Sequence, residues 1–157
     1  MVAVTTILVD LVSTAWANAY LRDRDPSFLS GLITFHLVYN TGAAFGLGQR
    51  HEWLVEVGEV VLLLLLAVLF RHVTLVARIG IAMAIGGGVG NLLVRLTGPE
   101  GPFHSPVIDW ISLSFYPATF NLADLALRVG VVVAIVGLIM GSRRRQPSAI
   151  PSGGVVG

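Results

Sequence analysis

The chain has 157 residues, of which 55% are hydrophobic and only 12% are charged, and its mean hydropathy is +0.82. A soluble domain carries roughly 25% charged residues, so this composition excludes an ordinary soluble protein and indicates a polytopic membrane protein. The net charge is +1 and the basic residues form no patch interleaved with aromatic residues, so we expect no nucleic-acid partner.

Each of four apolar runs approaches the ~20 residues that a helix needs to cross a bilayer. The runs lie at residues 2–21, 53–70, 75–96 and 122–140. They predict an all-α membrane fold with four transmembrane helices, in one domain of residues 1–145. A flexible tail rich in proline, serine and glycine follows at residues 146–157.

Polar and small residues within these runs predict where helices meet. Asp10 lies in the middle of the first run, and an acid inside a span is by default functional or hydrogen-bonded. Gly86 and Gly90 have the spacing that lets another helix pack closely. Asn91 and Arg95 follow at i and i+4, so they share one face near the end of the third helix.

The segments between the runs carry different signals. Residues 32–39 (LITFHLVY) are rich in β-formers and are followed by the turn signal Asn40-Thr41-Gly42, which predicts a small β platform on the membrane surface. A surface hairpin without function is the alternative. Residues 97–119, which contain several glycines and prolines, are expected to form an external loop.

The arginines predict the orientation of the chain. Cytoplasmic segments of membrane proteins carry an excess of Lys and Arg. Arginines occupy residues 143–145 after the fourth run, and Arg71 and Arg78 flank the short connection between the second and third runs. The β platform and the loop at residues 97–119 are then both outside the cytoplasm.

Two carboxylates stand next to apolar segments in residues 106–124. They are Asp109, after Val107-Ile108, and Asp124, at the start of the fourth run. Two close carboxylates cannot both ionise easily, so one tends to keep a proton. Such a pair can split an amide with water, because the ionised member accepts a proton and the protonated member polarises the carbonyl. The alternative is two acids at headgroup level that merely end a helix.

Arg128 lies one helical turn after Asp124, so both side chains can point the same way. A cation at that distance favours the ionised carboxylate. The alternative is that Arg128 extends outward to the lipid headgroups.

Zinc and thiol chemistry receive no support from the sequence. The chain contains no cysteine, which excludes thiol catalysis, disulfide bonds and cysteine metal sites. The four histidines form no paired metal-binding motif, so we expect no metal site.

Several short motifs, in order along nearly the whole chain, resemble the lipoprotein signal peptidase (signal peptidase II) family of bacterial membrane aspartyl proteases. Asp10 matches the acid of the family's first helix. Four further segments resemble family boxes: NTGAAF at residues 40–45, GNLLVRL at 90–96, VIDW at 107–110 and FNLAD at 120–124. The chain departs from the family pattern at Thr14, where a lysine is usual, at Val94, where an aspartate is usual, and at Arg128, where an apolar residue is usual.

The resemblance implies an endopeptidase that cleaves the signal peptide of prolipoproteins before a diacylglyceryl-modified cysteine, with no metal or organic cofactor. Asp109 and Asp124 are the implied catalytic pair. The implied substrate-binding or dyad-supporting residues are Asp10, Asn40, Gly42, Asn91, Arg95 and Asn121. The implied partners are lipidated prolipoproteins and membrane lipid. The implied location is the bacterial cytoplasmic membrane, with the active site at its outer face. We expect the protein to be monomeric.

Two other functions remain open from the sequence alone. The departures at Val94 and Arg128 favour a non-enzymatic relative that binds lipidated proteins. A small proton-coupled transport component is the second alternative, with Asp10, Asp109 and Asp124 as the proton path, although at least two of these acids gather at one membrane face rather than spreading through its depth.

Overall fold

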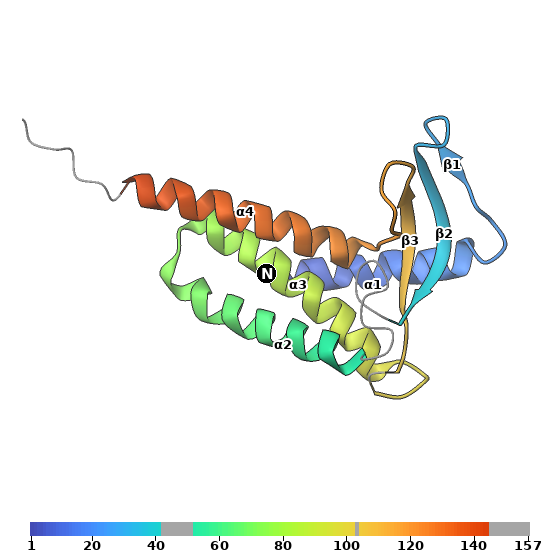
Figure 1. Ribbon diagram of the computed structural model, residues 1–157, viewed down its shortest axis with the longest axis horizontal. Coiled ribbons are helices and arrows are strands. Elements are labelled where there is room, and N and C mark those ends of the chain that lie inside the picture. Colours follow the sequence, from blue (N-terminus) through green and yellow to red (C-terminus); the bar gives the residue numbers. More distant parts are fainter. Residues whose placement is uncertain (42–51, 103, 145–157) are drawn as a thin grey trace, which may run out of the picture.

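The computed structural model describes residues 1–41, 52–102 and 104–144, and it shows four helices and a small sheet at one end of them (Figure 1). The sheet strands run across the helix axes. The elements, in chain order, are α1 (Val2–Tyr20), β1 (Ser27–Phe28), β2 (Ile33–Asn40), α2 (Glu52–Leu69), the short 3-10 helix η2 (Phe70–His72), α3 (Leu75–Thr97), β3 (Val107–Leu113) and α4 (Leu122–Arg144).

The long helices agree with the apolar runs of the sequence to within a few residues. Within the described residues, three helices are long and apolar enough to cross a membrane, namely α1, α3 and α4, and α2 contributes a shorter apolar stretch at Val60–Leu69. Large apolar side chains are exposed on the outer surfaces of all four helices. A helical backbone satisfies its own hydrogen bonds, so such surfaces suit contact with lipid tails.

Small residues bring α3 and α4 into close contact. A Cβ atom placed on Gly80 of α3 would lie only 2.3 Å from the backbone nitrogen of Ala134 in α4. On the facing helix, a Cβ atom on Gly130 would lie 2.5 Å from the Gly80 carbonyl oxygen. Gly86, predicted as a packing residue, instead faces α1, where its Cβ atom would lie 2.7 Å from the Ala3 carbonyl oxygen. Helix packing in membranes depends on such close backbone approach, and α3 therefore serves as the central helix.

The sheet is antiparallel with strand order β1-β2-β3. The predicted β segment at residues 32–39 corresponds to β2. The predicted loop at residues 97–119 is wrong for Val107–Leu113, because this β-branched stretch pairs with β2 as β3, with Val38 opposite Asp109 and Asn40 opposite Val107. Asp109 therefore lies on a strand, which holds its direction more firmly than a loop does.

An aromatic cluster joins the sheet to α1. Trp110 of β3 is buried together with Ala17 and Leu21 at the C-terminal end of α1. The Trp110 ring meets Trp16 and Phe35 edge-to-face, at centroid distances of 5.6 and 5.2 Å. Aromatic pairs in this geometry add about 0.5–1.5 kcal/mol each beyond burial, so the cluster fixes the position of β3 relative to the helices.

One domain prediction and one predicted site residue lie outside the described residues. The proposed boundary between a domain ending at residue 145 and a tail from residue 146 falls in 145–157, and Gly42 falls in 42–51.

Candidate active site

Asp109 is fixed by its strand and is almost fully buried, with 1% of its surface exposed. The side-chain amide of Asn40, on the neighbouring strand β2, donates a hydrogen bond of 2.8 Å to Asp109 Oδ2. The other oxygen, Oδ1, is buried and has no hydrogen-bond partner in the described part of the chain. Burial raises the pKa of Asp109 to about 7, the Asn40 hydrogen bond opposes this, and the charge of Asp124 raises it further.

Asp124 has more polar support than Asp109. It lies in the first turn of α4, where the helix dipole favours a negative charge. The side-chain amide of Asn91 in α3 donates a 3.0 Å hydrogen bond to Asp124 Oδ1. An Arg128 nitrogen lies 3.8 Å from Asp124 Oδ2, so the two form an ion pair across one helical turn.

A second asparagine connects α3 to the start of α4. Asn121 precedes α4, and its Oδ1 accepts a 2.8 Å hydrogen bond from the backbone amide of Asp124, as a helix N-cap does. Its Nδ2 donates to Asn91 Oδ1 at 3.0 Å. Because Asn91 and Asn121 are both buried, this short network fixes both side chains and thereby the direction of the Asp124 carboxyl group.

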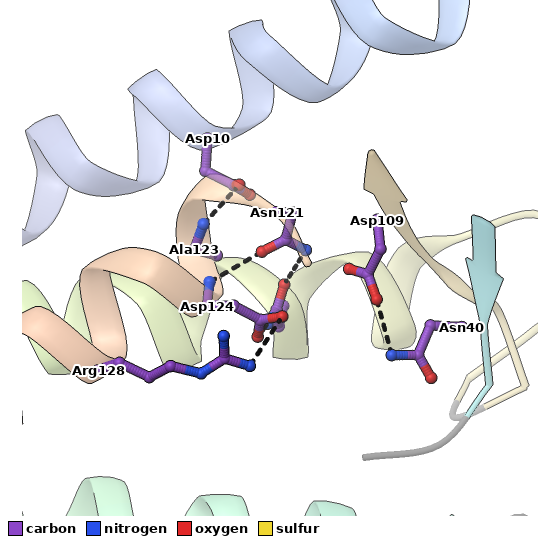
Figure 2. Close-up of polar contacts among 8 residues, drawn as sticks. Asp10, Asn40, Asp109, Asn121, Ala123, Asp124 and Arg128 are labelled. Carbon is purple, nitrogen blue, oxygen red and sulfur yellow. Dashed lines mark hydrogen bonds and ion pairs between the residues drawn. The ribbon is translucent and has the colours of Figure 1, made fainter. Parts of the chain in front are cut away.

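Asp10 forms its hydrogen bond with the backbone of α4 and not with either carboxyl group of the pair. Its Oδ1 accepts a 2.8 Å hydrogen bond from the backbone amide of Ala123 (Figure 2), and the side chain is 2% exposed. The first amides of a helix have no partner within the helix. Asp10 and Asn121 thus satisfy two of these amides, on consecutive residues, away from water.

Arg95 places a buried positive charge near the pair. It lies one turn after Asn91 on α3 and is 6% exposed. Its charge lowers the pKa of Asp109, against the larger effect of burial. Asn91 and Arg95 therefore both lie beside the carboxyl pair, one turn apart on α3.

The structure brings together seven of the eight residues predicted from the sequence, and Gly42 lies outside the described residues. Figure 2 shows the Asp109 and Asp124 carboxyl groups turned toward the same space between β3 and the start of α4. The predictions did not include the backbone amide of Ala123, or the rings of Tyr116 and Phe120 beside Arg128. In the described part of the chain, no three His, Cys, Asp or Glu side chains are placed to hold a metal ion.

The chemistry open to this arrangement is general acid–base catalysis. Asp109 has a pKa near neutrality, so it can hold and release a proton. Asp124 has a hydrogen-bond donor and a cation beside it, and both favour its charged form, whereas its burial acts against that form. The fold and the site together define a helical membrane protein with an aspartate pair of the kind that aspartic peptidases use.

Comparison with known proteins identifies the family. The family model for signal peptidase II matches residues 2–140. A lipoprotein signal peptidase of Bifidobacterium longum is 32% identical over 142 residues, which cover 89% of this chain and 77% of that protein. A lipoprotein signal peptidase of Mycobacterium tuberculosis is 31% identical over 144 residues, which cover 89% of this chain and 70% of the relative. The chain therefore belongs to the signal peptidase II family, and it is a protease that cleaves prolipoprotein signal peptides.

Two solved structures of bacterial membrane enzymes share the fold. One has a TM-score of 0.77 at 22% identity and covers 95% of this chain and 92% of its own. The other has a TM-score of 0.68 at 23% identity, with coverage of 88% and 90%. The arrangement of helices and sheet described above is thus found in experimentally solved proteins.

Proposed function

We propose that Asp109 and Asp124 hydrolyse the peptide bond that precedes a diacylglyceryl-modified cysteine in the prolipoprotein. The observation that carries this assignment is the difference between the two carboxyl groups. Asp109 is buried, accepts one hydrogen bond and titrates near neutrality, whereas Asp124 is paired with Arg128 and accepts from Asn91. One member of the pair is thus suited to hold the proton and the other to hold the charge.

The proton transfers follow from these two states. The Asp124 carboxylate takes a proton from a water molecule as the water oxygen bonds to the scissile carbonyl carbon, while Asp109 protonates the carbonyl oxygen. In the resulting tetrahedral intermediate, a hydroxyl proton returns to Asp109. The proton held by Asp124 passes to the leaving nitrogen, and the carbon–nitrogen bond breaks. Both carboxyl groups then regain their starting states.

The remaining polar residues hold this pair in place. Asn40 occupies one oxygen of Asp109 and so leaves Oδ1 to carry the proton. Asn91 and Asn121 orient Asp124, and Asp10 holds the first turn of α4. Pre-organised groups of this kind need little rearrangement during the reaction.

The proposed substrate is tested by asking whether cleavage requires the diacylglyceryl group on the cysteine. The full-length protein, in detergent micelles, should cleave a precursor whose cysteine carries diacylglyceryl. It should leave the same precursor intact when the cysteine is unmodified, and product mass spectrometry reports both outcomes. Equal cleavage of the two precursors would contradict the lipid requirement. Binding of the lipidated precursor without cleavage would instead support a relative that only binds lipidated proteins.

We further propose four membrane spans, with the carboxyl pair at the outer face of the bacterial cytoplasmic membrane. Arg71 and Arg78 lie by the connection between α2 and α3, and Arg143 lies near the end of α4. Figure 1 places the α2–α3 connection and the C-terminal end of α4 at the end of the bundle opposite the sheet. This distribution supports a cytoplasmic location for that end.

Reporter fusions test the orientation. A reporter fused after Arg145 should report the cytoplasm, and one inserted at Gly101 should report the outside. The same compartment for both fusions would contradict an α4 that spans the membrane, and the reverse assignment would place the carboxyl pair on the wrong side for secreted precursors.

A further inference from the structure

Arg128 occupies a defined position between Asp124 and two aromatic rings. Its guanidinium carbon lies 5.6 Å from the centre of the Tyr116 ring and 5.4 Å from the centre of the Phe120 ring. The two rings meet edge-to-face at 6.0 Å. A cation within about 6 Å of a ring centre is attracted to its face, so the rings and the Asp124 carboxylate hold the same side chain from two directions.

The rings themselves are anchored to the sheet. The backbone amide of Phe120 donates to the Ile111 carbonyl at 2.9 Å, and the Ile111 amide donates back to Phe120 at 2.9 Å. The Tyr116 amide donates to the Leu113 carbonyl at 2.9 Å. Both rings therefore keep a fixed place relative to β3, the strand that carries Asp109. Through them, Arg128 of α4 is positioned against the sheet.

The charges around Asp124 show what Arg128 contributes. Among the described side chains, the ionisable groups that act on this carboxylate are Asp10 of α1, Arg95 of α3, Asp109 of β3 and Arg128 of α4. Tyr116 is the nearby phenol, on the connection between β3 and α4. The guanidinium groups of Arg95 and Arg128 act on both Asp109 and Asp124. Without Arg128, Arg95 would be the one cation among the described side chains that acts on this pair.

We infer, on the basis of the proposed acid–base roles, that Arg128 is a positioning residue that keeps Asp124 as the charged member of the pair. Arg128 touches Asp124 at its Oδ2, while Asn91 holds Oδ1, so both oxygens have a fixed partner. The guanidinium group therefore decides which aspartate accepts the proton of the attacking water. It acts through Asp124 and needs no contact with the substrate.

The size of the effect is limited by exposure. The Arg128 side chain is 36% exposed and the Asp124 side chain 24%, and solvent screens a partly exposed ion pair. We expect Arg128→Gln to lower kcat roughly tenfold at pH 6 and to change KM by less than about twofold, since a ground-state contact with substrate is not removed. Arg128→Lys should keep most of the activity because it keeps the charge.

The dependence on pH separates an electrostatic role from a structural one. A carboxyl group that has lost its cation is ionised more fully as the pH rises. The ratio of variant to parent kcat should therefore increase between pH 6 and pH 8. Asp109 changes its protonation with pH in both proteins. Dividing the variant kcat by the parent kcat at each pH therefore cancels most of this shared effect. A structural role would lower the melting temperature and leave the ratio constant with pH.

Arg24 provides the matched control. It also lies over an aromatic ring, with its guanidinium carbon 4.5 Å from the centre of Tyr20, but it is in the segment after α1 and outside the site. Arg24→Gln removes the same charge and a comparable ring contact, and it should leave kcat unchanged. Arg128→Met is the second neutral variant, because its flexible apolar side chain can still pack on the rings if Arg128→Gln does not fold.

Three results would overturn the inference. Normal kcat with an altered dependence on anionic lipid would make Arg128 a headgroup anchor. Equal loss in Arg128→Lys and Arg128→Gln would show that charge is not what matters. A constant variant-to-parent ratio across pH would assign a structural role. Normal cleavage by Asp124→Asn would instead contradict the proposed function, because it would show that Asp124 is not needed for catalysis. This variant retains Arg128, so its result tests the proposed function separately from the role of Arg128.

Discussion

Replacing either Asp109 or Asp124 with asparagine should lower the rate of signal-peptide removal by about a hundredfold to ten-thousandfold, the range typical of a lost general acid or base. Asparagine has nearly the same shape as aspartate, but its amide cannot exchange a proton with water or with the leaving nitrogen. Initial rates on a lipidated precursor measure the effect, and thermal unfolding in detergent verifies that each variant is folded.

The matched control is Asp25→Asn, because Asp25 is an exposed carboxylate in the segment after α1. It should cleave at the parent rate. Near-normal cleavage by either Asp109→Asn or Asp124→Asn, with the variant folded, would mean that the missing carboxyl group is not part of the chemistry.

The proposed role of Asp109 as the general acid also predicts how kcat changes at alkaline pH. Asp109 must hold a proton to donate it to the carbonyl oxygen, and burial raises its pKa to about 7. Below that pH the acid form dominates, and above it Asp109 loses the proton. The value of kcat for the parent protein should therefore fall as the pH rises through about 7 and beyond.

Gly80→Ala should destabilise the folded protein. A Cβ atom at this position would lie 2.3 Å from the Ala134 nitrogen, 2.5 Å from the Gly130 oxygen and 2.9 Å from the Ala134 Cα atom. All three are backbone atoms, so no side-chain rotation can relieve the contact and α3 must move away from α4. We expect a loss of about 1–3 kcal/mol in the free energy of unfolding, measured as a lower melting temperature in detergent.

Gly58→Ala is the control for this substitution. Gly58 lies in α2, and a Cβ atom there would meet no other atom within 4 Å. Alanine is favoured over glycine inside a helix by roughly 0.5–1 kcal/mol, so this variant should be as stable as the parent or slightly more stable. Equal destabilisation by both variants would show that close packing of α3 on α4 is not the reason.

The helices were predictable because an apolar run of this length has few other stable states in a membrane. The site acids were predictable for a related reason, since an acid such as Asp10 is costly within a span unless it has a role. Strand β3 was missed because its seven residues follow a glycine- and proline-rich segment and precede a short segment that contains Pro117. Its β-branched residues indicate a strand only when β2 is known to lie beside them as a pairing partner.

The tertiary contacts of the site left little trace in the sequence. The hydrogen bond from Ala123 to Asp10 joins residues 113 positions apart and uses a backbone amide, which every residue except proline possesses. The ion pair of Arg128 with Asp124 was one of two predicted alternatives, because their spacing on one helix is visible in the sequence. The rings of Tyr116 and Phe120 beside Arg128 depend on the path of the chain between β3 and α4.

The contact between Asp10 and the start of α4 has a consequence for biosynthesis. Helix α1 leaves the ribosome before α4 and supplies the acceptor, and α4 supplies both the amide and Asp124. A nascent chain therefore lacks the backbone partner of Asp10 and one member of the carboxyl pair until α4 has been inserted. On the proposed assignment of the carboxyl pair, proteolytic activity arises only once α4 has been synthesised, so a translation product stalled before α4 would not cleave its neighbours in the membrane.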